Sequence, residues 1–185
     1  MDHESMDDIY IKKVCAGDTD SFRYFVRKYK DMAFSVAVSV VKDEFLAEEV
    51  VQEAFINAFK KIKSFNQKSK FNTWFYRIVI NEAFKRLKKI KKEVVSFIEE
   101  YDQEVVDESV LVSLQEEEQT YYINEALKKL SPNESLILRL FYLQDESIKA
   151  VCEVTGWSES KVKVTLFRAR KNMLLILNHL FKLEP

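Results

Sequence analysis

Glycine and proline are scarce in this chain of 185 residues, which contains only two of each. A protein made of many β-hairpins needs glycine at its tight turns, whereas helices tolerate the scarcity. Hydrophobic residues make up 47% and charged residues 32% of the chain, a balance typical of a globular protein rather than a disordered one. The composition therefore predicts an all-α fold with one ordinary core or two small ones.

No uninterrupted apolar run reaches membrane-spanning length, and the acidic start MDHESMDD lacks the basic and apolar stretches of a secretory signal. We therefore expect a cytoplasmic protein that does not insert into a membrane. The two cysteines, Cys15 and Cys152, lie far apart in the sequence, and a reducing compartment argues against a disulfide.

Histidine is equally rare, with only His3 and His179. Two histidines near opposite ends cannot supply a zinc site or a catalytic triad. Neither phosphate-cradling glycines nor paired carboxylates in a pocket motif are present. An enzyme is thus the least favoured class, and no cofactor or metal is expected.

Charge is divided sharply along the chain although the net charge is only −1. Residues 70–92 carry eight cations against one acid, residues 93–118 carry ten acids and no cation, and residues 128–185 carry ten cations against six acids. This division predicts a domain at 1–92, an acidic linker at 93–118 and a second domain at 119–185. Basic domains of this kind bind the phosphate backbone of nucleic acids, although a solvated charged surface explains these runs of charge equally well. The acidic linker itself is either a solvated spacer or a mimic of nucleic acid in a positive channel.

A helix capped by Asn72 or Thr73 and ending near Lys92 has two different sides. One side is an apolar stripe suited to burial, and the other side combines a ring with cations, which suits unstacked nucleotides. For Trp74 the residues alone favour a core position at the helix start over a nucleotide contact. The apolar stripe comprises Tyr76, Val79, Ile80, Ala83, Phe84 and Leu87, and the polar side comprises Trp74, Arg77, Asn81, Lys85, Lys88 and Lys92.

The preceding helix, capped by Asp43, has a broad apolar face and an opposite polar strip. Such a strip is usually solvated, but acids and amides also suit a basic helical partner. The apolar face comprises Leu46, Val50, Val51, Ala54, Phe55, Ala58, Phe59 and Ile62, and the polar strip comprises Glu49, Gln52, Glu53, Asn57 and Lys60.

The C-terminal part reads as a helix-turn-helix. Ser131 opens a capping box, Ser147 caps a short helix that ends at Gly156, and Ser158 caps a final helix from Glu159. On that final helix an apolar side faces a shared core, and a cationic and hydroxyl-bearing side suits the DNA major groove. The groove-facing side comprises Ser160, Lys161, Val164, Thr165, Arg168 and Lys171, flanked by Lys163 and Arg170, which suit phosphates.

Four ordered segments carry a family resemblance: GDTDSFRYFVRKY, AEEVVQEAFINAFKKIKSF, FNTWFYRIVINEAFKRLKK and ALKKLSPNESLILRLFYLQ with GWSESKVKVTLFRARKNM. Together they cover nearly the whole chain, which resembles bacterial RNA polymerase sigma factors of the extracytoplasmic-function (ECF) group. The resemblance implies a sigma factor that binds core RNA polymerase and directs promoter-specific initiation. An anti-sigma partner is common in the family, and no residue here identifies one.

The resemblance also implies roles for particular residues. The polar strip would bind a coiled coil of the polymerase through Glu49, Gln52, Glu53 and Asn57. The displaced single strand of the minus-ten element would be captured, with one base flipped into a pocket, by Asn66, Lys70, Phe71, Asn72, Trp74, Arg77, Asn81, Lys85 and Lys88. The minus-thirty-five duplex would be read by Ser160, Lys161, Val164, Thr165 and Arg168, with Lys163 and Arg170 on its phosphates.

Five positions depart from the family pattern. Ala150 replaces a usual Glu, Thr155 a large apolar residue, Lys161 a Thr and Thr165 a frequent Arg, whereas Lys85 stands where an acid is common. We therefore expect this protein to depend on minus-ten capture more than its relatives do.

Two rival functions fit parts of the chain. A helix-turn-helix regulator that acts without polymerase leaves the first domain unexplained, and an adaptor that binds only proteins leaves the cations of the final helix unexplained. Copurification with core polymerase separates a sigma factor from the regulator, and promoter-specific transcription separates it from the adaptor.

Overall fold

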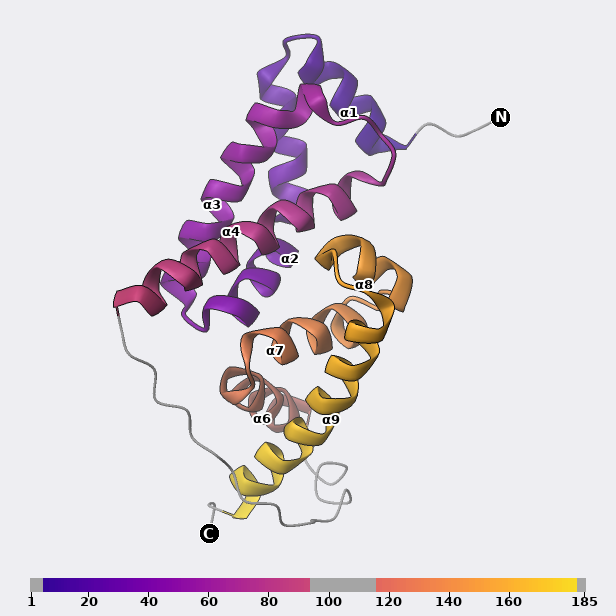
Figure 1. Ribbon diagram of the computed structural model, residues 1–185. Helices are drawn as coiled ribbons and strands as arrows, with labels where there is room; N and C mark the ends of the chain where they lie inside the picture. Colours follow the sequence, from indigo (N-terminus) through magenta and orange to yellow (C-terminus); the bar gives the residue numbers. More distant parts are fainter. Residues whose placement is uncertain (1–4, 94–115, 183–185) are drawn as a thin grey trace. The chain divides into compact units, whose positions relative to one another are not determined.

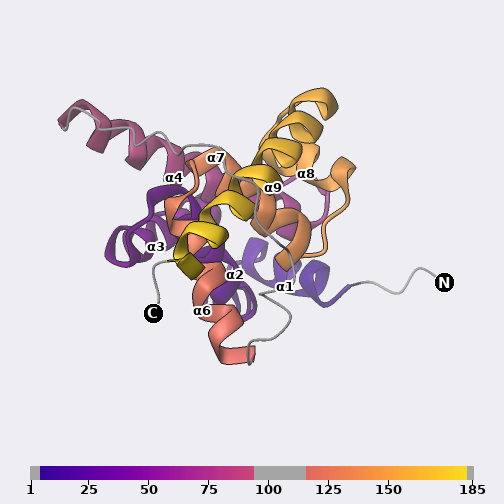
Figure 2. The same cartoon turned by 90° about the horizontal axis from the view of Figure 1, so that it is seen from below.

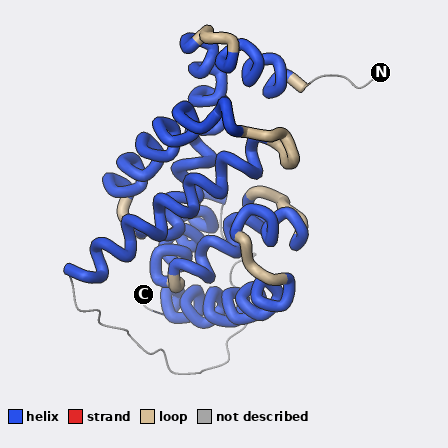
Figure 3. Tube along the Cα trace, turned by 45° about the horizontal axis from the view of Figure 1, so that its top comes forward, coloured by secondary structure: helices blue, strands red, loops and turns tan. Residues whose placement is uncertain are grey.

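The computed structural model describes residues 5–93 and 116–182, and every regular element in these ranges is a helix (Figures 1 and 3). The predicted all-α fold is confirmed. The helices group into two compact units, with α1–α4 in the first and, in the main, α6–α9 in the second. Most of the acidic linker predicted at 93–118 lies outside the described residues. No helix within the described ranges is long and apolar enough to cross a membrane.

The first unit consists of α-helices and two short 3₁₀ turns within the described residues. Its elements are α1 (Met6–Cys15), η1 (Thr19–Phe22), α2 (Arg23–Val41), α3 (Glu44–Lys61), η2 (Ile62–Ser64) and α4 (Phe71–Glu93).

Two helix starts in this unit were predicted from capping chemistry, and one prediction was wrong. At α3 the carboxylate of Asp43 accepts a hydrogen bond of 2.8 Å from the N–H of Leu46, as expected of an N-cap. At α4 the helix begins at Phe71, ahead of the predicted cap, and the N–H of Trp74 already donates to the carbonyl of Lys70 at 3.2 Å. The earlier start is explained by Phe71, whose ring is 3% exposed and is held in the core.

Aromatic rings form much of the core of this unit. Phe25 of α2 and Phe75 of α4 have no exposed surface. The ring of Phe75 lies 4.6 Å from that of Phe55 on α3, and the ring of Phe71 lies 4.2 Å from that of Phe25. Such pairs each contribute about 0.5–1.5 kcal/mol beyond the burial of their area. The rings therefore fix α4 against both α2 and α3.

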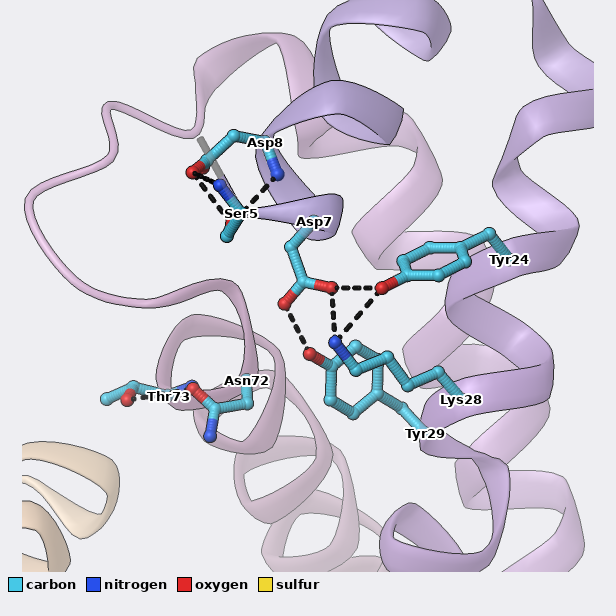
Figure 4. Close-up of polar contacts among 8 residues, drawn as sticks. All are labelled: Ser5, Asp7, Asp8, Tyr24, Lys28, Tyr29, Asn72 and Thr73. Carbon is cyan, nitrogen blue, oxygen red and sulfur yellow. Dashed lines mark hydrogen bonds and ion pairs between the residues drawn. The ribbon is translucent and has the colours of Figure 1, made fainter. Parts of the chain in front are cut away.

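A polar cluster attaches α1 to α2 (Figure 4). The carboxylate of Asp7 accepts hydrogen bonds from Tyr24 at 2.8 Å, Lys28 at 2.6 Å and Tyr29 at 2.5 Å. The ring of Tyr10 on α1 also stacks on that of Tyr24 at 4.1 Å. Burial alone raises the pKa of Asp7, but the hydrogen bonds from these three side chains outweigh it and lower the pKa below its ordinary value of 3.8. The cluster thus stabilises the ionised carboxylate.

We expect Asp7→Asn to lower the free energy of unfolding by about 1–2 kcal/mol at neutral pH, because hydrogen bonds to a charged group are lost and Lys28 is partly exposed. A carboxylate with a depressed pKa stabilises the fold above its unfolded-state pKa, and this stabilisation is lost as the pH falls through the folded-state pKa. Urea unfolding of both proteins from pH 7 to about pH 3 measures the difference, which should shrink below about pH 3.9. A difference that is independent of pH would contradict the role given to Asp7.

The second unit contains a series of helices in which α9 packs against both α6 and α7 (Figure 2). Its elements are α6 (Glu116–Lys129), α7 (Pro132–Leu138), the π-helical turn η3 (Arg139–Leu143), α8 (Ile148–Thr155) and α9 (Glu159–Lys182).

The predicted helix caps of this unit are confirmed. Ser131 forms a full capping box with Glu134, and Ser147 accepts a hydrogen bond of 3.1 Å from the N–H of Ala150. Gly156 ends α8 at φ 73°, a left-handed conformation that favours glycine. Ser158 accepts from the N–H of Lys161 at 3.3 Å. Helices α8 and α9 with this turn form the predicted helix-turn-helix, and its core includes Val151, Val162, Leu166, Ala169 and Ile176.

Candidate nucleic-acid interface

Helix α4 carries a row of exposed polar side chains, which we call the α4 ridge: Arg77, Asn81, Lys85 and Lys88. The opposite side of the helix is packed, as predicted, with Tyr76, Val79, Ile80 and Ala83 buried. The ridge is therefore held in place by the core beneath it. Within the ridge, the ammonium of Lys85 lies 3.0 Å from Glu82, while 76% of the Lys85 side chain remains exposed.

Trp74 precedes the ridge on α4 and is half-buried. Its ring lies 5.0 Å from that of Phe65 in the loop before α4 and 5.5 Å from that of Phe71. Trp74 thus packs on neighbouring rings, as expected of a core position at the helix start, and is still only half-buried. Phe65 was missed by the sequence analysis, since its contact with Trp74 depends on how the loop folds back.

The loop residues predicted to bind single-stranded DNA differ in exposure. Asn66 and Lys70 are exposed and Asn72 is half-buried, whereas Phe71 is buried. The side-chain oxygen of Asn66 accepts from the N–H of Lys68 at 3.2 Å. The side-chain oxygen of Asn72 accepts from the N–H of Thr73 at 2.8 Å, as Figure 4 shows. The amide groups of both asparagines still have donors that these bonds do not use.

The polar strip of α3 is tied partly to α4. Glu49 forms an ion pair with Arg86, and the amide of Asn57 donates to Glu82 at 3.1 Å. Since Glu82 also holds Lys85, one carboxylate connects the strip to the α4 ridge. The other two residues predicted to bind polymerase, Gln52 and Glu53, are exposed.

Exposed apolar side chains accompany this strip, and the sequence analysis did not predict them as site residues. Phe45 is 70% exposed, Ile56 45% and Phe59 38%. At about 100° per residue, Phe45, Gln52 and Ile56 lie within roughly 40° of one another on α3. Phe45 and Ile56 lie off the apolar stripe of the helix, and that misplacement was the available signal. Exposed apolar side chains edged by acids and amides are typical of a surface that binds another protein.

On α9 the residues predicted to face the major groove are accessible. Ser160, Lys161, Val164 and Arg168 are exposed, and Thr165 is half-buried. The ammonium of Lys161 lies 4.2 Å from the centre of the Trp157 ring, a cation–π contact that orients this side chain. Phe167, 69% exposed, adds an apolar group next to Val164 that was not predicted.

The two cations predicted to flank this face have different partners. Lys163 forms an ion pair with Glu159 one turn earlier, at 2.6 Å, and its hydrogen bond lowers the pKa of that exposed carboxylate. Arg170 instead donates from Nε to the hydroxyl of Tyr142 at 2.6 Å. The face thus combines hydrogen-bond donors, cations and an apolar side chain that can contact a thymine methyl group. This combination suits duplex DNA.

Comparison with known proteins finds matches to both units of the fold. A family model for sigma-70 region 2 matches residues 25–93, and one for sigma-70 region 4 matches residues 121–173. The ECF RNA polymerase sigma factor SigW of Bacillus subtilis is 31% identical over 173 residues, which is 87% of this chain and 91% of SigW.

Two solved structures share the fold. CnrH, in complex with the cytosolic domain of CnrY, has a TM-score of 0.64 at 19% identity and aligns with 92% of this chain and 96% of its own. The sigma factor RpoE of Bartonella quintana, in complex with the anti-sigma factor NepR, has a TM-score of 0.66 at 22% identity. The alignment covers 85% of this chain and 96% of the RpoE chain.

Proposed function

This chain belongs to the extracytoplasmic-function group of RNA polymerase sigma factors, and from this premise we propose how its surfaces divide the work of promoter recognition. As a member of that family it directs RNA polymerase to promoters. The proposal assigns melted minus-ten DNA to the first unit, the minus-thirty-five duplex to the second and core polymerase to α3. The corresponding domains are residues 1–92 and 119–185.

The α4 ridge and Trp74 bind the displaced minus-ten strand in this proposal. The observation that carries it is a half-buried ring that precedes a row of exposed polar and cationic side chains, on a helix whose opposite side is buried. Bases stack on aromatic rings with about 1–3 kcal/mol each, while Lys and Arg follow the phosphates of a single strand. Flipping a base costs a few kcal/mol, which stacking and pocket contacts must offset.

The loop before α4 completes the capture surface. Asn66, Lys70 and Asn72 are close in sequence to Trp74 and offer amide and ammonium donors to a base edge or a phosphate. Phe71 supports Trp74 from the core in this arrangement, because only 3% of its surface is exposed. We therefore assign Phe71 a positioning role rather than a direct contact with DNA.

The exposed face of α9 reads the minus-thirty-five element as duplex. Arg168 and Lys161 supply donors for base edges, and Val164 supplies an apolar contact for a thymine methyl. Lys163 and Arg170, on the flank, contact phosphates.

The polar strip of α3 and the exposed apolar side chains beside it bind core polymerase. Gln52 and Glu53 offer polar contacts there, with Glu49 and Asn57 at the α4 side of the strip, and Phe45 and Ile56 supply the apolar area that drives association. Both solved relatives are in complex with a protein partner, which supports the further proposal that an anti-sigma factor holds this chain inactive.

Reconstituted transcription tests the proposal as a whole. The full chain is mixed with core polymerase and a library of random promoter sequences, and the transcribed templates are sequenced. We expect copurification with core polymerase and enrichment of templates that share two elements. Transcripts without any shared element, or failure to bind core polymerase, would contradict the proposal and favour an adaptor or an independent regulator.

Neutralising the α4 ridge is expected to impair promoter opening more than neutralising α9. The double variant Lys85→Gln, Lys88→Gln should lower open-complex formation roughly tenfold, because two phosphate contacts to the melted strand are lost. Lys161→Gln with Lys163→Gln removes the same number of charges from α9 and should have the smaller effect. Permanganate reactivity of unpaired thymines measures both, and equal or reversed losses would reject this ranking.

A further inference from the structure

Tyr142 lies outside all of the surfaces assigned above, although its side chain is 54% exposed. It belongs to η3, the π-helical turn that continues α7, and insertions of this kind are frequent at functional sites. Its hydroxyl accepts the hydrogen bond from Arg170 Nε, and the Arg170 guanidinium lies 5.4 Å from the centre of the Tyr142 ring and 5.8 Å from that of Phe141. Arg170 is thus held by an aromatic pair rather than by a carboxylate.

We propose that Tyr142 and Arg170 together form a phosphate clamp that binds one DNA backbone position beside the groove-facing side of α9. This inference rests on the proposed binding of duplex DNA by α9. It adds Tyr142 to that interface as a residue that contacts the DNA and also positions Arg170.

The hydrogen-bonding groups of the pair suit a phosphate. Tyr142 uses a lone pair to accept from Arg170, so the phenolic hydrogen remains able to donate to an anionic oxygen. Arg170 uses only Nε in this bond, and the terminal nitrogens of its guanidinium still carry hydrogens. Within the described ranges Arg170 forms no ion pair with an acid. Two neighbouring groups can therefore donate to one phosphate, and the guanidinium supplies the charge.

The position of the pair on α9 suits a backbone contact rather than a base contact. At about 100° per residue, Arg170 lies roughly 120° around the helix from Val164, the centre of the groove-facing side. Lys163, seven residues earlier, lies within roughly 20° of Arg170. The clamp and Lys163 thus form a row along one flank, as expected where α9 passes a DNA strand.

A salt titration distinguishes the two members of the clamp. Binding of the full chain to a labelled random-sequence duplex is measured by fluorescence anisotropy over a series of KCl concentrations. Arg170→Gln removes a charge, so the slope of log affinity against log salt should become shallower by about 0.9. Tyr142→Phe removes a neutral donor and keeps the ring, so affinity should fall roughly fivefold at every salt concentration with the slope unchanged. Tyr142→Ala also removes the support of Arg170 and should change both.

Tyr121→Phe is the matched control, because Tyr121 is 59% exposed on α6 in the same unit. This variant should bind duplex with the affinity of the parent chain. Tyr142→Phe with parental duplex affinity would overturn the clamp. A loss of core polymerase binding with duplex affinity intact would also overturn it, because Tyr142 would then contact a protein. If the parent chain fails to bind duplex at all, the proposed role of α9 and the clamp fail together.

Discussion

Replacing Phe45 and Ile56 by serine is expected to weaken the binding of core RNA polymerase by about 100-fold. Both side chains are exposed in the free protein, at 70% and 45%. They lie on the same side of α3 as Gln52. Burying a Phe or an Ile stabilises a complex by about 1.5–3 kcal/mol each, and about 3 kcal/mol in total corresponds to that factor. Fluorescence titration of labelled protein with core polymerase measures the dissociation constant.

Exposure also makes this experiment easy to interpret. Since neither side chain is buried, the double variant should unfold at the same urea concentration as the parent chain. Met6→Ser is the matched control, because Met6 is an exposed apolar residue, at 55%, on α1 of the same unit. A change of less than about threefold in the double variant would show that α3 does not supply the main apolar contact with polymerase.

Trp74→Ala is expected to lower the affinity of the holoenzyme for a single-stranded minus-ten oligonucleotide by about 10- to 100-fold. Removing a ring on which a base stacks costs about 1–3 kcal/mol, and the loss of a base pocket adds to this. Trp74→Phe keeps a smaller ring and should recover part of the affinity. Anisotropy of a labelled oligonucleotide measures all three proteins.

The half-buried position of Trp74 requires a second measurement. Its ring packs on Phe65 and Phe71, so Trp74→Ala is also expected to reduce stability. The free energy of unfolding is measured alongside, and Phe65→Ala serves as a comparison that disturbs the same ring cluster. If Phe65→Ala and Trp74→Ala lower single-strand affinity equally, Trp74 acts through packing and not through stacking on a base.

Local chemistry explains what the sequence predicted correctly. The starts of α7, α8 and α9 depend on serine side chains that bond to N–H groups within three residues, and such bonds need no tertiary information. The buried side of α4 could also be predicted without tertiary information, because helical periodicity alone places Val79, Ile80 and Ala83 on one side.

Packing explains what the sequence left open. The start of α4 at Phe71 depends on a place in the core among rings from α2, which local capping rules cannot anticipate. Whether the polar strip of α3 is free or paired was also undetermined, since the contact of Glu49 with Arg86 joins residues far apart in the chain. Phe59 was predicted to be buried and is 38% exposed, because the apolar stripe of α3 is wider than its buried contact.

The division of labour between α4 and α9 can be tested with two DNA probes in one measurement. Holoenzyme affinity is determined for the single-stranded minus-ten element and for the minus-thirty-five duplex selected from the promoter library, using Trp74→Ala and Arg168→Gln. We predict that Trp74→Ala loses affinity only for the single strand and Arg168→Gln only for the duplex. Equal losses on both probes, or the reverse assignment, would contradict the proposal that the first unit holds melted DNA and the second reads intact duplex.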